Sequence, residues 1–414
     1  MPVVNVWGSI SPTTRTAHPE PPEPHDEWSL AGGTAWVYYS PLNRRQLVRP
    51  VILADGFSTG ASDLAELWAG LEENGDYRFI SELHATGRDV IILGYHNRAA
   101  SILDNADTAI ECIRRTLSER VGRAKLAVGG FSMGGLVTRY ALAKMENDPS
   151  LPDAETSTYF SYDTPHRGAW LPISVQAFAH FTKDNWGSNM PIFGQFSDLI
   201  NSAAARQMAR WHISKISETP EQDAERTAFL RKLDEVGGWP RGVRKVGVAN
   251  GVDNGRGNGI EPGVVAAVGR GQALPEATLF TQARGEQIVA TLDSADQPAV
   301  HIRTAGLPDL DGAPGGLFPE STVLPGNPGN FGMASMLMFA LGCETELPVN
   351  TSCFIPTISA VAAKEIDDRT ALYSPIRPDD SELDAFLCAS TNQGHTAMTE
   401  ELGAWIVNEI LSTD

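Results

Sequence analysis

Ser132 lies in the sequence GFSMG (residues 130–134), where two differently patterned segments meet. A short apolar run at residues 125–129 predicts a strand, and residues 133–145 have the spacing of a helix. Gly-x-Ser-x-Gly between a strand and a helix is typical of a nucleophile elbow, whose strained turn needs small neighbours and exposes the serine Oγ. Such a serine attacks carbonyl carbons, provided that a histidine takes its proton. The alternative is an ordinary strand-to-helix turn whose glycines serve packing.

Apolar runs and amphipathic helices alternate around Ser132. We expect strands at residues 34–40, 49–57, 87–95, 125–129 and 244–251, and another within residues 156–168 that ends in a loop. Helices are expected at residues 61–75, 103–120 and 133–145. This alternation predicts an α/β fold with a mostly parallel sheet and helices on both faces. Ligands of such sheets bind at the carboxyl ends of the strands, where Ser132, Gly56 and Pro165 fall.

Four units follow from this pattern. They are an N-terminal arm and first strand (1–48, the arm at 11–27), a core (49–168), a helical cap or lid insertion (169–243), and a last unit (244–414) that completes the core. The last unit includes an antiparallel β insertion (about 260–310), with three short runs at hairpin spacing within residues 277–306. The alternative for residues 169–243 is a set of helices that pack on the body. The glycine-rich GRGNG lacks the features of a phosphate loop.

Three segments resemble the α/β-hydrolase superfamily, in its lipase and esterase branch. They are GGFSMGGLVTRYAL (129–142), PVILADGFSTG (50–60) and SYDTPHRGAW (161–170). More loosely, APGG, CFIPTISA and NQGH resemble a group of poorly characterised bacterial α/β-hydrolases. Asp55 stands where lipases usually have a histidine. The resemblance implies the α/β-hydrolase fold and two oxyanion donors, the backbone N–H groups of Met133 and Phe57.

The same fold implies the chain order serine, acid, histidine. Five histidines follow Ser132, namely His166, His180, His212, His301 and His395. We predict His395 as the base, because it lies in a polar loop directly before the amphipathic last helix at residues 397–411. His166 belongs to the Pro-His-Arg-Gly loop and is expected to shape the pocket or to bond backbone.

The acid is the least determined member of the expected triad. Related lipases often have an aspartate before a Val-Pro-like pair, but that place here reads NTSCFIP and holds no acid. We favour Asp311, in DLDGAPGG, because glycines fix the geometry of its loop. Asp384, near His395 in sequence, and Asp253, directly after the strand at 244–251, remain open as alternatives. Any of the three is equally well explained as a loop aspartate that caps its own turn.

Composition and net charge limit the kinds of partner that the protein is expected to bind. The 414 residues carry a net charge of −19, which argues against nucleic acid or an anionic membrane as partner. No run of 18 apolar residues occurs, no signal peptide is visible, and a cytoplasmic location is expected, with a secreted mature form left open. No cofactor is expected, and no His/Cys/Asp cluster has metal-ligand spacing. Cys343 and Cys353 are candidates for a disulfide only in an oxidising compartment.

The sequence therefore predicts a serine hydrolase that cleaves a small, apolar carboxylic ester through an acyl-enzyme intermediate. A thioesterase, lactonase or acyltransferase that acts on a biosynthetic intermediate uses the same machinery and remains an alternative. A non-catalytic binding module with a relic elbow is the alternative from another class.

Overall fold

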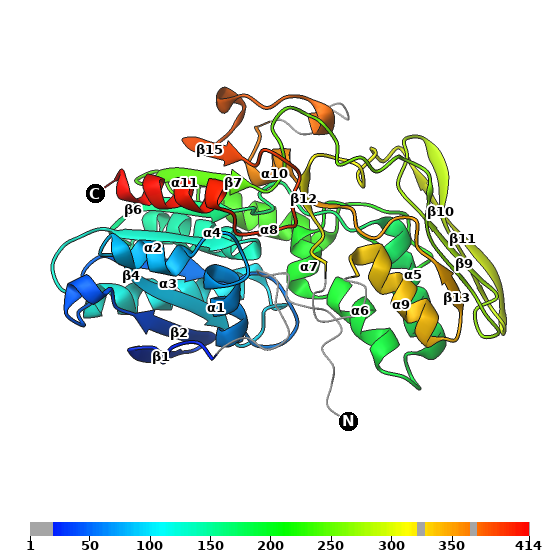
Figure 1. Ribbon diagram of the computed structural model, residues 1–414, viewed down its shortest axis with the longest axis horizontal. Coiled ribbons are helices and arrows are strands. Elements are labelled where there is room, and N and C mark those ends of the chain that lie inside the picture. The colour runs from blue at the N-terminus through cyan, green and yellow to red at the C-terminus, as the bar shows by residue number, and fades with distance from the viewer. Residues whose placement is uncertain (1–19, 321–327, 365–370, 414) are drawn as a thin grey trace.

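The computed structural model describes residues 20–320, 328–364 and 371–413 (Figure 1). Part of the arm expected at residues 11–27 lies outside these ranges. The strand expected at 34–40 is β2 (Gly33–Tyr38), which forms an antiparallel hairpin with β1 (Asp26–Leu30).

A mixed eight-stranded sheet forms the centre of the molecule, with the order β1-β2-β4-β3-β5-β6-β7-β15. Its other strands are β3 (Pro50–Ala54), β4 (Asp89–Tyr95), β5 (Leu126–Phe131), β6 (Thr156–Tyr162), β7 (Arg244–Ala249) and β15 (Ala385–Cys388). The β1–β2 and β2–β4 pairings are antiparallel, and all the others are parallel. The mostly parallel sheet expected from the sequence is therefore confirmed.

Helices cover both faces of this sheet because alternate residues of its buried strands point to opposite sides. In β3, Val51 and Leu53 belong to one core cluster, and Ile52 and Ala54 belong to the other. The first cluster includes residues of α1 (Leu64–Glu72), α2 (Phe79–Ala85) and α11 (Glu400–Leu411). The second includes residues of α3 (Ile102–Glu119) and α4 (Met133–Asn147).

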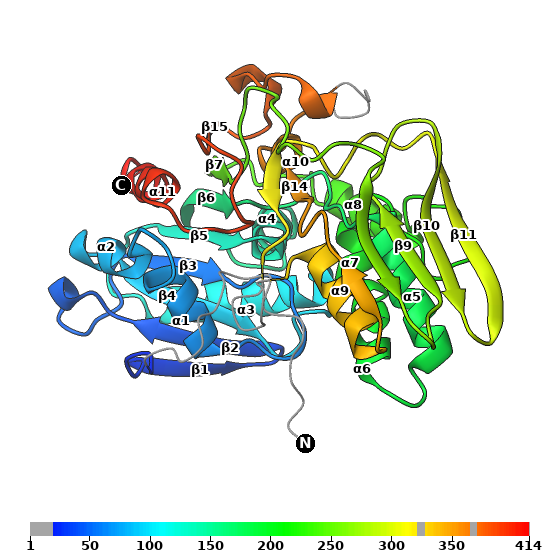
Figure 2. The same ribbon diagram turned by 45° about the vertical axis from the view of Figure 1, so that its right-hand side comes forward.

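A second group of elements lies beside the central sheet (Figures 1 and 2). The residues expected to form a cap hold α5 (Ile173–Trp186), α6 (Ile192–Ile200), α7 (Ala203–Met208) and α8 (Ala224–Glu235). A five-stranded antiparallel sheet has the order β11-β10-β9-β8-β13. Its strands are β8 (Val265–Arg270), β9 (Glu276–Phe280), β10 (Glu286–Ser294), β11 (Gln297–Ala305) and β13 (Glu344–Glu346), and α9 (Asn330–Ala340) packs on it. The expected antiparallel addition is confirmed, with β8 and β13 as further strands.

A short antiparallel pair, β12 (Gly315–Leu317) and β14 (Cys353–Pro356), lies between the central sheet and this second group (Figure 2). It is followed by the short helix α10 (Thr357–Ala360). The short 3-10 helices η1 (Pro41–Asn43), η2 (Ala371–Tyr373) and η3 (Pro378–Asp380) lie in connecting segments.

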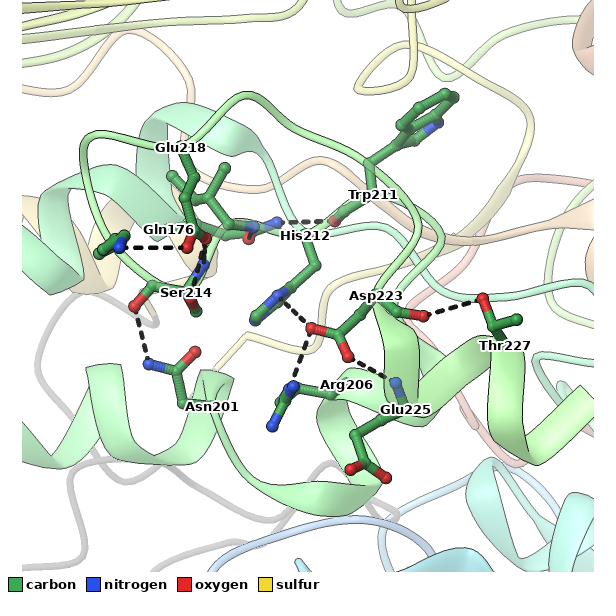
Figure 3. A network of polar contacts seen from close by, with 12 residues as sticks. Gln176, Asn201, Arg206, Trp211, His212, Ser214, Glu218, Asp223, Glu225 and Thr227 are labelled. Carbon is green, nitrogen blue, oxygen red and sulfur yellow. Dashed lines mark hydrogen bonds and ion pairs between the residues drawn. The ribbon is translucent and has the colours of Figure 1, made fainter.

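Buried polar contacts hold the connection between α7 and α8 in place (Figure 3). Asp223 caps α8 by accepting a hydrogen bond from the N–H of Glu225. The same carboxylate lies 3.1 Å from His212 Nδ1 and 3.0 Å from Arg206 Nε. From α5, Gln176 accepts from the N–H of Ile213 at 3.0 Å. Residues of α5, α7 and α8 are thereby tied to one connecting segment.

The four cysteines are free and buried, so the disulfide considered between Cys343 and Cys353 is not formed. The two thiols face different groups, because Cys343 lies at the carbonyl of Leu274 and Cys353 at the carbonyl of Pro314. Over the described part of the chain, no helix combines the length and apolar character that a membrane crossing requires.

Candidate active site

Ser132 occupies the turn between β5 and α4, with φ 52° and ψ −124°. A positive φ is unfavourable for a residue with a Cβ, so the surrounding structure must hold this conformation. Gly130 and Gly134 allow this turn, because the backbone packs so closely around them that no side chain would fit. A Cβ on Gly130 would lie 2.4 Å from the backbone carbon of Gly134, and a Cβ on Gly134 would lie 2.3 Å from the carbonyl oxygen of Ala54. The elbow geometry predicted from GFSMG is therefore present.

His395 is brought to this serine by the loop that connects β15 to α11. Its Nε2 lies 2.7 Å from Ser132 Oγ, and its Nδ1 lies 2.6 Å from Asp163 Oδ2. The imidazole and the Asp163 carboxylate are fully shielded from solvent. A carboxylate only accepts, so Nδ1–H donates to Asp163, and Nε2 is left to accept from the Ser132 hydroxyl.

Asp163 follows β6, the strand beside β5. Phe131 pairs with Tyr162 in that ladder, and the N–H of Ser132 donates to the carbonyl of Tyr162 at 2.9 Å. Ser132 and Asp163 each follow one residue of this pair. They therefore leave the sheet side by side, at the carboxyl ends of β5 and β6. The second carboxylate oxygen, Oδ1, accepts from the N–H of Asn250 at 3.0 Å. A Cβ on Gly316 would lie 2.0 Å from Oδ2, so only glycine fits there.

The prediction of Asp311 as the partner of His395, with Asp384 and Asp253 as alternatives, is corrected by this geometry. Asp311 is buried elsewhere and accepts from the N–H of Gln282 at 2.7 Å. Asp384 pairs with Lys245, and Asp253 is exposed. All three belong to loops after β7 or later in the chain. Asp163 was missed although SYDTPHRG had been singled out, and its position directly after a strand was the available signal.

The other four histidines do not contact Ser132. His166 Nε2 lies 3.1 Å from Ser161 Oγ, and His180 lies between Ser197 and the carbonyl of Ile213. His212 faces Asp223, and the exposed His301 lies near Thr291. Burial lowers the pKa of His166 well below its usual value, and two neighbouring arginines, Arg139 and Arg167, act in the same direction.

Backbone contacts hold the His395 loop against β12. The N–H of Leu317 donates to the carbonyl of Gln393, and the N–H of His395 donates to the carbonyl of Leu317, both at 2.8 Å. The Asn250 amide adds bonds to Gln393 Oε1 and to the carbonyl of Ala397. The sequence analysis gave no supporting role to Asn250, Leu317 or Gln393, although Gln393 lies in the segment NQGH.

The two predicted oxyanion donors lie on neighbouring segments. Met133 is the first residue of α4, so its N–H has no acceptor within the helix. Phe57 lies in the loop after β3. The carbonyl oxygen of Ala54, the last residue of β3, packs closely against Gly134 near the start of α4. Among the described residues, neither N–H meets a protein acceptor.

An aromatic pair lies beside the imidazole of His395. The ring of Phe354 is edge-on to it at 5.1 Å, and Phe318 packs on Phe354 at 5.2 Å. The buried thiol of Cys353 is next to this site, and burial together with the nearby carboxylates of Asp163 and Asp311 raises its pKa well above the usual value. Within the described ranges, no group of three His, Cys, Asp or Glu side chains is placed to hold a metal ion.

Residues 51–189 match the model of the family described as "Putative serine esterase (DUF676)". The matched range contains Ser132, Asp163 and both predicted oxyanion residues. The chain has the α/β-hydrolase fold. The resemblance to the lipase and esterase branch is confirmed by this match, and the fold by the sheet described above. No curated protein matches this chain significantly.

Several solved structures are similar to part of this chain. The mature lipase BlEst2 of Bacillus licheniformis is 15% identical over 52% of this chain and 71% of its own, with a TM-score of 0.32. Est1E from Butyrivibrio proteoclasticus is 12% identical over 54% and 76%, with a TM-score of 0.30. An esterase of Pyrobaculum calidifontis is 17% identical over 54% and 73%, with a TM-score of 0.28. At such low values, these likenesses carry no argument about activity.

Proposed function

We propose that this protein is a serine-dependent carboxylic ester hydrolase with the triad Ser132, His395 and Asp163. The observation that carries the proposal is the continuous contact from Ser132 Oγ through both nitrogens of His395 to a buried carboxylate, at 2.7 Å and 2.6 Å. This is the arrangement that activates a serine hydroxyl, and it is recognised by geometry rather than by sequence position. The family match of the segment that contains Ser132 supports the same chemistry.

In the first half of the reaction, Ser132 Oγ attacks the ester carbonyl while His395 Nε2 takes the hydroxyl proton. Asp163 holds the imidazole in the required tautomer and stabilises the imidazolium. The carbonyl oxygen becomes an oxyanion and accepts from the N–H groups of Met133 and Phe57. His395 then returns the proton to the leaving alcohol as the C–O bond breaks and the acyl-enzyme forms.

In the second half, a water molecule attacks the acyl carbonyl and His395 takes its proton. The tetrahedral intermediate collapses, the carboxylic acid leaves, and Oγ regains its proton. The ring of Phe354 beside the imidazole, with Phe318 packed on it, favours a substrate with an apolar group, because apolar surface is favourably buried against such rings.

The direct experiment compares the wild type with Ser132→Ala. The wild type should hydrolyse a short-chain p-nitrophenyl ester and should be labelled at Ser132 by a fluorophosphonate, and the variant should do neither. The exposed Ser118 supplies a matched control, Ser118→Ala, which should keep both properties. A Ser132→Ala enzyme with wild-type turnover would contradict the proposal. A parallel product assay with thioesters and lactones would identify the leaving group.

A further inference from the structure

The loop after β3 carries one of the two proposed oxyanion donors, the N–H of Phe57. It is held close to the elbow, because a Cβ on Gly134 would lie 2.3 Å from the carbonyl oxygen of Ala54 and 2.5 Å from that of Asp55. The loop has neither helix nor strand structure of its own between Asp55 and Ser62. Something other than a regular ladder must therefore fix the orientation of its peptide groups.

The side chain of Asp55 supplies that fixation. It is 2% exposed, and its Oδ1 accepts from the N–H of Gly56 at 2.6 Å. Its Oδ2 accepts from the hydroxyl of Ser62 at 2.6 Å. Ser62 is itself anchored to the end of β4, since Tyr95 N–H donates to its Oγ and its own N–H donates to the carbonyl of Tyr95, both at 2.8 Å. One buried carboxylate thus joins both ends of the loop.

Arg98 supports the middle of the same loop and provides a positive charge. Its side chain is 2% exposed, and Nη1 lies 3.8 Å from Asp55 Oδ2 and 3.3 Å from Glu66 Oε2. Its Nη2 donates to the carbonyl of Thr59, and its backbone N–H donates to the carbonyl of Gly60. The buried carboxylate therefore has a cation and two hydrogen-bond donors around it, which hold it in one orientation.

We propose that Asp55 is a positioning residue for the oxyanion hole. Its carboxylate accepts from the N–H of Gly56, which belongs to the peptide group directly before that of Phe57. The orientation of the Phe57 N–H is thereby fixed, and this N–H remains free to donate to the oxyanion. The role rests on the proposed ester hydrolysis, and Asp55 acts through Phe57 rather than on the substrate. Histidine, which related lipases usually have at this place, offers at most one acceptor nitrogen, whereas the carboxylate accepts from Gly56 and Ser62 at once.

The experiment compares Asp55→Ala with Asp55→Asn. Alanine removes both acceptors, whereas asparagine keeps an oxygen for the Gly56 N–H and an NH₂ that can donate to Ser62 Oγ. Each variant is titrated with a fluorophosphonate so that rates refer to active sites and not to total protein. For Asp55→Ala, kcat per site should fall about 10²-fold or more, as for loss of one oxyanion donor, with KM changed only a few-fold. Asp55→Asn should remain within about 10-fold of the wild type, because it keeps both contacts.

A trifluoromethyl ketone tests the same geometry in a second way. Ser132 Oγ adds to its carbonyl carbon, the hydroxyl proton goes to His395, and the carbonyl oxygen becomes an oxyanion in the proposed hole. Its Ki for Asp55→Ala should rise by the factor by which kcat/KM falls, because both depend on that oxyanion. A merely structural role would lower the melting temperature and the number of titratable sites, but would leave kcat per site and Ki unchanged.

Asp89, the first residue of β4, offers a matched control at the amino end of that strand. It is also fully buried, and its carboxylate accepts from the N–H groups of Ser40, Val48 and Arg49. Asp89→Ala should reduce stability while kcat per site and Ki stay at wild-type values. Should Asp55→Ala fail to fold, Ser62→Ala replaces it, and an unchanged kcat and Ki there would refute the inference.

The outcomes separate the inference from the proposed function. A wild type that is not labelled at Ser132 would overturn the function, and the role of Asp55 with it. A labelled wild type with an unaffected Asp55→Ala variant, or with a lost kcat and an unchanged Ki, would overturn the role of Asp55 alone.

Discussion

His395 and Ser132 are 263 residues apart in the chain, yet 2.7 Å separates Nε2 of the one from Oγ of the other. The contact depends on two supports that lie far from both residues in sequence. The backbone of β12 holds the histidine loop, and the end of β6 supplies the carboxylate for Nδ1. Each of the following predictions tests one part of this arrangement.

The carboxylate of Asp163 should be essential and that of Asp311 dispensable. Asp163→Asn should lower kcat by roughly 10⁴-fold, because an amide no longer fixes the tautomer that leaves Nε2 free to take the serine proton. Asp311→Asn and Asp384→Asn should retain wild-type activity, since neither residue contacts His395. Steady-state kinetics on a p-nitrophenyl ester provides the comparison. If Asp311→Asn were the inactive variant, the triad proposed here would be wrong.

Asp311 should instead reduce stability at high pH. Burial raises its pKa to about 7, although the hydrogen bond from the N–H of Gln282 acts in the opposite direction. Between the unfolded pKa near 4 and this folded value, the folded state binds more protons, so stability falls as pH rises. Above pH 7 the loss is complete and amounts to about 4 kcal/mol.

Asp311→Asn should therefore melt at a higher temperature than the wild type at pH 8.5, and the difference should shrink toward pH 4. Melting curves over this pH range give the measurement, with the exposed Asp253→Asn as a control that shows no such trend. An equal difference at both ends of the range would argue against a buried, neutral Asp311.

His212 should contribute to instability in acid. Burial lowers its pKa, and the carboxylate of Asp223 offsets this only in part. The unfolded state then takes up a proton before the folded state does, so stability is lost as pH falls below about 6.5. His212→Asn keeps a donor for Asp223 and should reduce the pH dependence by at most about one proton.

Denaturant unfolding at several pH values between 5 and 8 measures this dependence. The variant His301→Asn changes an exposed imidazole and should leave the slope as in the wild type. A His212→Asn protein with an unchanged slope would show that this imidazole does not govern the acid response.

Gly316 should tolerate no side chain, because a Cβ would lie 2.0 Å from Asp163 Oδ2. Gly316→Ala should displace the carboxylate or the β12 backbone, lower kcat by at least about 10-fold, and reduce stability by about 1–3 kcal/mol. Gly242→Ala is the control, since the nearest atom to its Cβ would be a carboxylate oxygen of Glu146 at 3.7 Å. Full activity in Gly316→Ala would mean that the acid need not occupy this position.

The sequence alone determined the parts of this protein that depend on local physics. Strand and helix periodicity gave the mostly parallel sheet, and the turn at GFSMG indicated the nucleophile because only small residues permit a positive φ at Ser132. His395 was predicted as the base because it lies in a polar loop directly before the last helix, and its Nε2 lies 2.7 Å from Ser132 Oγ.

The tertiary structure alone shows which aspartate lies against His395 and what holds that aspartate in place. Asp163, Asp311, Asp384 and Asp253 are all loop aspartates, and the position of Asp163 directly after a strand does not separate it from Asp253. The pairing of β5 with β6 brings Asp163 level with Ser132, and the close approach of Gly316 fixes its carboxylate. Such contacts depend on strand order and register between distant segments, and local residue patterns do not encode these relations directly.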